Sequence, residues 1–159
     1  MNTSHTMFIG GPRPAFAGSW IYNWMSGEWS ATKPMSKGRS GPGCFSTGNN
    51  GGVLVFGGYN GVALLSVEQY HPDTGAWSQE PDMPPGFGVS SHITPLNLGD
   101  GVELALFRQS NRVYQHNAET RQWSLLEGVQ LPNTFDGYNR NYGHDKAFLV
   151  PYDFVPSCN

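Results

Sequence analysis

Histidine and cysteine are the residues most able to bind a metal ion, so their spacing shows whether the sequence contains a metal-site pattern. No histidine is followed by another at i+4, and none lies beside a cysteine, so no zinc-ligand pattern is present. His144 and Asp145 are adjacent, but neighbours in a strand point to opposite faces and do not form a catalytic dyad by themselves. We therefore predict no metal site and no cofactor, and we expect each histidine to be structural or solvated. The histidines are His5, His71, His92, His116 and His144.

Nucleophilic and phosphate-binding motifs are also missing from the sequence. No Gly-x-Ser-x-Gly elbow occurs. The glycine-rich stretch 48–52 is not followed by Lys-Ser or Lys-Thr, which favours a hairpin turn over a phosphate loop. The carboxylates are scattered, and the sequence alone does not show the spatial pair that glycoside hydrolysis needs. We predict no catalytic residues.

Composition narrows the class of protein. The 159 residues include 21 Gly and 12 Pro, and only 13% are charged, which indicates many short strands joined by turns. The net charge is −3, and the nine Lys and Arg residues occur singly, which argues against a nucleic-acid partner. No apolar stretch is long enough to span a bilayer, and no secretory signal is visible at the N-terminus, so the compartment stays open. Cys44 and Cys158 are expected to be unpaired thiols; one disulfide between them is the alternative.

An internal repeat dominates the chain. Three segments ending in tryptophan align without gaps, with a period of about 47 residues. A hydrophobic run ending in a glycine pair repeats with a similar period, although the third copy has Arg108-Gln109 in place of the glycines. The aligned segments are Tyr22–Trp29, Tyr70–Trp77 and His116–Trp123, and the glycine pairs are Gly10-Gly11 and Gly57-Gly58.

The combination of glycine pair, tyrosine and tryptophan resembles the kelch repeat, over roughly residues 5–132. This resemblance implies an all-β fold of four-stranded antiparallel blades arranged as a β-propeller, incomplete or oligomerising. It assigns structural roles to Gly10, Gly11, Tyr22, Trp29, Gly57, Gly58, Tyr70, Trp77 and Trp123. The three tryptophans are expected to pack in the core between blades.

The residues between these landmarks predict the strands of a blade. The apolar run 53–56 is typical of a buried strand, and the glycine pair lets the backbone leave it where a Cβ would clash with the next blade. Residues 66–70 alternate polar and apolar as a third strand, and Trp77 begins the outer strand. Opening strands are expected at 43–47, 91–96 and 146–150.

We predict a single domain over residues 1–159. Its predicted strands make about three blades, at 5–35 (completed by 140–155), 40–85 and 88–131. Closed propellers use about four to eight blades. We therefore expect either a fragment of a larger propeller with a truncated N-terminus, or identical chains that close one ring together.

The connecting loops carry the residue types that dominate protein interfaces. They include aromatic residues that we expect to be exposed, such as Phe16 in the segment 12–16. The predicted binding rim is Tyr59, Arg108, Arg112, Tyr138 and Arg140. The favoured function is a non-catalytic module that binds a protein or peptide. The alternatives are a fragment of a kelch-fold carbohydrate-active or oxidase-type enzyme, although no copper-ligand set is matched, and a self-assembling structural propeller protein.

Overall fold

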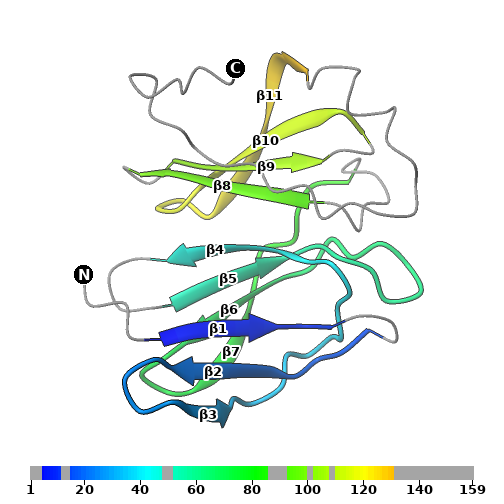
Figure 1. Cartoon of the computed structure of the whole chain (residues 1–159). Helices are drawn as coiled ribbons and strands as arrows, with labels where there is room; N and C mark the ends of the chain where they lie inside the picture. Colours follow the sequence, from blue (N-terminus) through cyan, green and yellow to red (C-terminus); the bar gives the residue numbers. More distant parts are fainter. Residues whose placement is uncertain are drawn as a thin grey trace, which may run out of the picture.

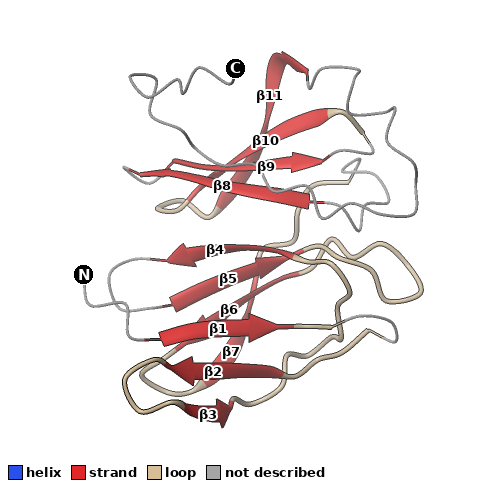
Figure 2. Cartoon of the chain, viewed as in Figure 1, coloured by secondary structure: helices blue, strands red, loops and turns tan. Residues whose placement is uncertain are grey.

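The computed structural model describes residues 5–11, 15–47, 52–85, 93–99, 102–107 and 110–130. These residues form strands joined by turns and loops, with no helix among them (Figures 1 and 2). The fold is all-β, as the turn-rich composition predicts. The strands are β1 (His5–Ile9), β2 (Ser19–Asn23), β3 (Glu28–Ala31), β4 (Gly43–Thr47), β5 (Gly52–Phe56), β6 (Val67–His71), β7 (Ala76–Glu80), β8 (Ile93–Gly99), β9 (Val102–Phe107), β10 (Arg112–Asn117) and β11 (Gln122–Gln130).

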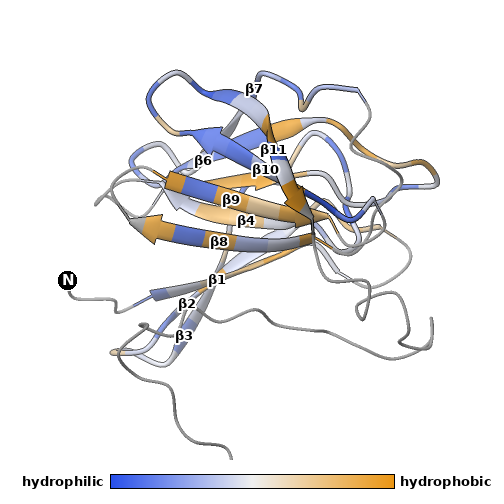
Figure 3. Cartoon of the chain, turned by 90° about the horizontal axis from the view of Figure 1, so that it is seen from above, coloured by the Kyte–Doolittle hydropathy of each residue, from blue (hydrophilic) through white to orange (hydrophobic). Residues whose placement is uncertain are grey.

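The strands form three antiparallel sheets that follow the chain order. The first contains β1-β2-β3, the second β4-β5-β6-β7 and the third β8-β9-β10-β11. The second sheet lies between the other two, and its opening strand β4 runs beside β8 of the third sheet (Figures 1 and 3). β4 has the predicted bounds 43–47, whereas β6 begins and ends one residue later than the predicted strand 66–70.

Register assigns every side chain to one of two faces of its sheet, because residues directly opposite each other share a face. In the second sheet, Leu54, Phe56 and Val67 lie on one face. Val55 and Tyr70 lie on the other. All five are at most 5% exposed, so both faces of this sheet are covered.

The hydrophobic core lies between the second and third sheets. The ring of Trp123 is 4.9 Å from that of Phe56 and 6.2 Å from that of Phe45. Arg121 adds an ion pair to the buried carboxylate of Glu80 across the same boundary, with 2.8 Å between Nη1 and Oε2. The buried members of the core cluster are Phe45, Leu54, Phe56, Val67, Met83, Ala105, Phe107 and Tyr114.

The first sheet has one described strand fewer than the others. β1, β2 and β3 correspond in order to the second, third and fourth strands of the other two sheets. The strand predicted at 146–150, and the segment 140–155 proposed to complete this sheet, lie outside the described residues.

Candidate functional site: the loop rim

Three loops lie at the same end of their sheets because each follows the corresponding strand. The loops after β1, β5 and β9 all leave toward the side to which these strand arrows point in Figure 1. We call residues 10–18, 57–66 and 108–112 the loop rim; within it, 12–14 and 108–109 are outside the described residues. The described parts of the rim therefore follow the same ends of the three sheets.

Arg39 and Ser40 together join two of the rim loops through their backbones. The N–H of Arg39 donates to the carbonyl of Phe16 at 3.1 Å, and its own carbonyl accepts from the N–H of Gly11 at 3.3 Å. The next residue, Ser40, exchanges two backbone hydrogen bonds with Tyr59, both 3.0 Å long. Residues 39–40 thus hold the loops 10–18 and 57–66 against each other.

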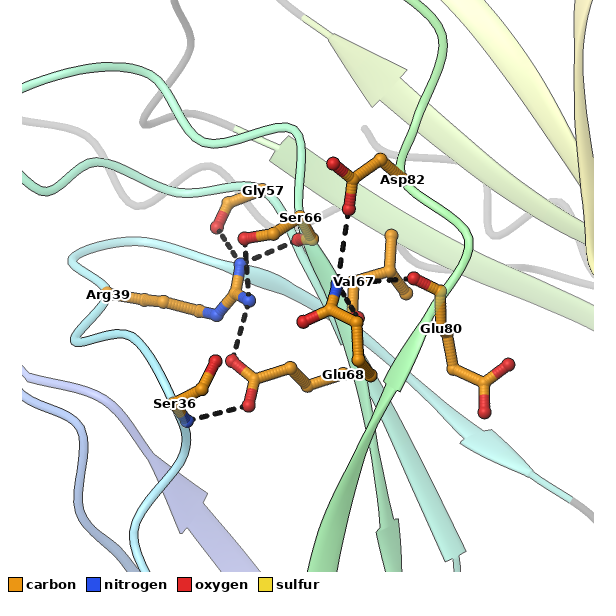
Figure 4. A network of polar contacts seen from close by, with 9 residues as sticks. Ser36, Arg39, Gly57, Ser66, Val67, Glu68, Glu80 and Asp82 are labelled. Atoms are coloured by element: carbon orange, nitrogen blue, oxygen red, sulfur yellow. Dashed lines mark hydrogen bonds and ion pairs between the residues drawn. The ribbon is translucent and has the colours of Figure 1, made fainter.

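The side chain of Arg39 closes the base of the loop 57–66 (Figure 4). Nη1 donates to the carbonyl of Gly57 at 2.9 Å and to the carbonyl of Ser66 at 2.7 Å, so one group ties together both ends of the loop. Nη2 donates to Ser66 Oγ at 3.0 Å and to Glu68 Oε1 at 2.9 Å. Arg39 is 0% exposed, and this bonding makes the loop a positioned element.

Glu68 neutralises the buried guanidinium. Its other oxygen, Oε2, accepts from the backbone N–H of Ser36 at 2.7 Å, which also fixes the linker between the first and second sheets. Glu68 is 2% exposed, so the pair is shielded from solvent. Breaking such a pair from one side leaves an uncompensated buried charge, which makes the two residues dependent on each other.

The glycine pair allows the loop 57–66 to leave β5 within this packing. Gly57 has φ +64°, and a Cβ there would lie 2.6 Å from the Ile93 side chain of the third sheet. Gly58 has φ +89°, and a Cβ there would lie 3.0 Å from the Ser40 carbonyl oxygen. Both the left-handed backbone and the close neighbours therefore require glycine.

The rim presents a mixed apolar and polar surface. Val62 is 65% exposed and Phe16 is 45% exposed, and Phe16 stacks on Trp20 with ring centroids 5.2 Å apart. Tyr59 is half-buried and forms isolated antiparallel bridges with Ser40 and with Ala63. These side chains form the described part of the candidate site.

Two of the five predicted rim residues are described. Tyr59 lies in the loop 57–66, and Arg112 is exposed at the start of β10, at the same end of its own sheet. Arg108, Tyr138 and Arg140 lie outside the described residues. Arg39 and Glu68 were missed, because an isolated arginine in a Gly-Ser segment and a single glutamate in a strand carry no distinguishing pattern.

The repeat tryptophans occupy equivalent positions but differ in exposure. Trp77 is partly buried, and its indole Nε1 donates to the carbonyl of Lys33 at 2.9 Å. Trp123 is partly buried against the core. Trp29, by contrast, is 57% exposed, so the prediction that it packs in the core is wrong. The reason is that its face of the first sheet has no described sheet packed on it.

The remaining repeat landmarks serve packing. Tyr70 is buried with its ring centroid 5.3 Å from that of Trp77, and half-buried Tyr22 lies 4.9 Å from Trp29. Gly10 has φ +69° and lies, with Gly11, against the Arg39 segment, continuing the hydrogen-bonded base of the rim. These residues therefore support the site without forming its surface.

His116, which replaces the repeat tyrosine, is a structural residue. It is 4% exposed, and its Nδ1 is 2.7 Å from Oε2 of the buried Glu103. Its ring packs 4.7 Å from that of Trp123. The buried carboxylate partner and the packed indole support a structural role for this histidine.

A histidine–serine contact occurs on β6 and β7, but it lacks the geometry of a catalytic triad. His71 Nε2 is 2.7 Å from Ser78 Oγ. The nearby carboxylate of Glu80 contacts Ser78 at 3.4 Å and is held by Arg121 through both oxygens. In a triad the acid orients the histidine, whereas here it contacts the serine and an arginine.

Among the described residues, no group of three or more His, Cys, Asp or Glu side chains could hold a metal ion. No helix in that part of the chain is long and apolar enough to cross a membrane. Cys44 is exposed on β4 and forms no disulfide there, and Cys158 lies outside the described residues.

Comparison with protein families identifies the middle sheet. Residues 40–84, which include β4 to β7 and the loop 57–66, match the family model of the kelch motif. The chain contains a kelch repeat. The kelch sheet, flanked by two further antiparallel sheets, is consistent with blades of a β-propeller. No curated protein matches the sequence.

Proposed function

We propose that this chain is a non-catalytic interaction module that binds a protein or peptide across the loop rim. Kelch repeats commonly mediate protein interactions, which supports the class of function. The observation that carries the proposal is the buried Arg39, which ties residues 10–18 and 57–66 into one positioned surface. Binding residues concentrate on loops held by a rigid scaffold.

The rim has the composition of a binding surface. Phe16 and Val62 expose apolar area, and Tyr59 and Arg112 supply residue types enriched at interface hot spots. A preformed loop also lowers the ordering cost of association. An extended or turn-shaped segment of a partner suits such a surface better than a small molecule.

Peptide selection on the immobilised chain tests this proposal. A random peptide library is selected against the wild type, and enriched peptides are titrated by calorimetry. Val62→Asp is expected to weaken binding by about tenfold or more, because it places a charge in the apolar part of the rim. Leu98→Asp is the matched control, since Leu98 is also an exposed apolar residue (46%) but lies at the opposite end of its sheet.

The outcome separates the rim from other surfaces. Equal peptide affinity for the wild type and Val62→Asp, with loss in Leu98→Asp, would move the site to the other end. If no peptide is enriched, the binding proposal fails for this surface.

The non-catalytic character is tested on the same purified chain. We expect no turnover of glycans or alcohols, either as purified or after incubation with copper or zinc. Turnover that is retained in Val62→Asp and is proportional to bound metal would replace the interaction module with an enzyme.

A further inference from the structure

The turn between β2 and β3 exposes two large apolar side chains. Trp24 is 61% exposed and Met25 is 80% exposed, the highest value for a large apolar residue in the described part of the chain. Single apolar residues on a surface are normal, but here a tryptophan and a methionine are adjacent at the tip of a hairpin. Their position therefore needs a reason, either in the fold or in a ligand.

The backbone of this turn recurs in all three sheets. Residues 23–28, 71–76 and 117–122 each join the last two strands of their sheet. In each, a backbone N–H donates to the carbonyl of the residue four positions earlier, and the donor residue has a positive φ. These bonds run from Gly27 to Asn23 at 2.8 Å, from Gly75 to His71 at 2.9 Å and from Arg121 to Asn117 at 2.8 Å.

The other two turns have no large apolar residue where the first has Trp24 and Met25, so the turn itself does not require this pair. By the shared register of the flanking strands, the equivalent residues are Pro72, Asp73, Ala118 and Glu119. Asp73 is exposed although the second sheet is covered on both faces. This position therefore stays at the surface whatever packs against the sheet that carries it.

Local hydrogen bonds hold the two exposed residues in place. Asn23 Oδ1 accepts from the backbone N–H of Met25 at 2.8 Å. The indole Nε1 of Trp24 donates to Thr6 Oγ1 at 2.7 Å, and its ring meets that of Tyr22 edge-on, with centroids 4.8 Å apart. Because Trp24 is already oriented, its ordering on binding a partner costs less conformational entropy.

The three turns lie together on the side of the molecule opposite the loop rim, at the left of Figure 1. We call residues 23–28, 71–76 and 117–122 the turn surface. Its carboxylates are exposed and form no ion pair with another described residue; they are Glu28, Asp73 and Glu119. Its one arginine, Arg121, is held by Glu80, whose two oxygens are 2.9 and 2.8 Å from Nη1. The turn surface is therefore acidic around an apolar pair.

We propose that the turn surface is a second binding site, for a Lys- and Arg-rich segment of a partner protein that also carries an apolar residue. Trp24 and Met25 form its anchor, since tryptophan is enriched at binding hot spots and methionine adapts to irregular surfaces. The three carboxylates attract the basic groups, and the exposed indole attracts Lys or Arg to its ring face. This site shares no residue with the loop rim.

Two matched peptide sets test the proposal by fluorescence anisotropy with the full chain. In one set a Leu or Phe lies between Lys and Arg residues, and in the other the same residue lies between Asp and Glu residues. We expect binding of the basic set only, with an affinity that falls as salt rises, because salt screens the exposed carboxylates. Equal binding of both sets would overturn the proposal, since apolar contact alone would then account for it.

Trp24→Ala/Met25→Glu removes the anchor and keeps the turn, because it copies Ala118-Glu119, with which the third sheet forms the same turn. It should weaken binding of the basic peptides by about tenfold or more, even though it adds a carboxylate. Asp73→Asn/Glu119→Gln should weaken binding by about twofold to fivefold and flatten its salt dependence. Circular dichroism and thermal melting establish that each variant folds.

The loop rim supplies the control. Val62→Asp should leave binding of the basic peptides unchanged, and Trp24→Ala/Met25→Glu should leave unchanged the peptides that lose affinity for Val62→Asp. The turn-surface proposal fails if no basic peptide binds, if these peptides bind Trp24→Ala/Met25→Glu as tightly as the wild type, or if Val62→Asp abolishes their binding.

Sedimentation velocity separates a partner protein from a second copy of the chain. Self-association of the wild type that is lost in Trp24→Ala/Met25→Glu would overturn the proposal, because the occupant would then be another copy. We expect both proteins to sediment alike. Failure at the turn surface with retained peptide binding at the rim leaves the proposed function standing, so the two can fail separately.

Discussion

Replacing Arg39 with methionine tests whether one buried guanidinium holds the base of the rim. The substitution removes hydrogen bonds to Gly57, Ser66 and Glu68. It leaves the Glu68 carboxylate, which is 2% exposed, with its hydrogen bond from the Ser36 N–H but without its charged partner. Breaking a buried pair from one side costs about 3–5 kcal/mol. For a chain of this size, each kcal/mol lowers the Tm by about 2–4 °C, so we expect a drop of about 6–20 °C.

Urea unfolding and thermal melting followed by circular dichroism measure this effect. Arg112→Met is the control, because Arg112 is exposed and its loss should change the free energy of unfolding by less than about 0.5 kcal/mol. The double variant Arg39→Met/Glu68→Leu should be more stable than the sum of the two single changes predicts, by about 0.5–3 kcal/mol, because it removes the stranded carboxylate. Equal destabilisation by Arg39→Met and Arg112→Met, or strict additivity in the double variant, would refute the reasoning.

Two further predictions concern the contacts around the kelch sheet. Trp77→Phe removes the indole N–H that donates to the Lys33 carbonyl. In urea titrations it should lower the free energy of unfolding by about 0.5–1.5 kcal/mol for the lost hydrogen bond, in addition to the effect of the smaller ring. An unchanged unfolding midpoint would contradict the hydrogen bond to the linker of the first sheet. Gly58→Ala should destabilise more than Gly75→Ala by about 1 kcal/mol or more, since both have positive φ but only Gly58 would bring a Cβ to 3.0 Å from backbone; equal melting temperatures would show that φ alone matters.

The position of the strands was largely predictable from local patterns. The run 43–47 coincides with β4, and the apolar run 53–56 lies within β5. Trp77 is the second residue of the outer strand β7. These agreements follow because strand formation, turn residues and repeat spacing are properties of short segments. The glycine pair belongs with them, since its positive φ is a local requirement.

The composition of the rim was only partly predictable. Tyr59 and Arg112 lie at the same end of their sheets because strand order places their loops there. The residue that positions the loop 57–66 is Arg39, which is 18 to 29 residues away in sequence from its side-chain partners. Such a long-range bond leaves no spacing signature, and a buried arginine resembles an exposed one in the sequence.

The sequence by itself determined the repeat, the all-β class and the position of the three repeat tryptophans within it, because these depend on periodicity and turn chemistry within about 50 residues. Only the tertiary structure decided which tryptophans are buried. Trp77 and Trp29 occupy equivalent positions, yet Trp77 is partly buried and Trp29 is 57% exposed. Whether a tryptophan is buried depends on which part of the chain packs against its face of the sheet. The residues of that face alone do not determine this.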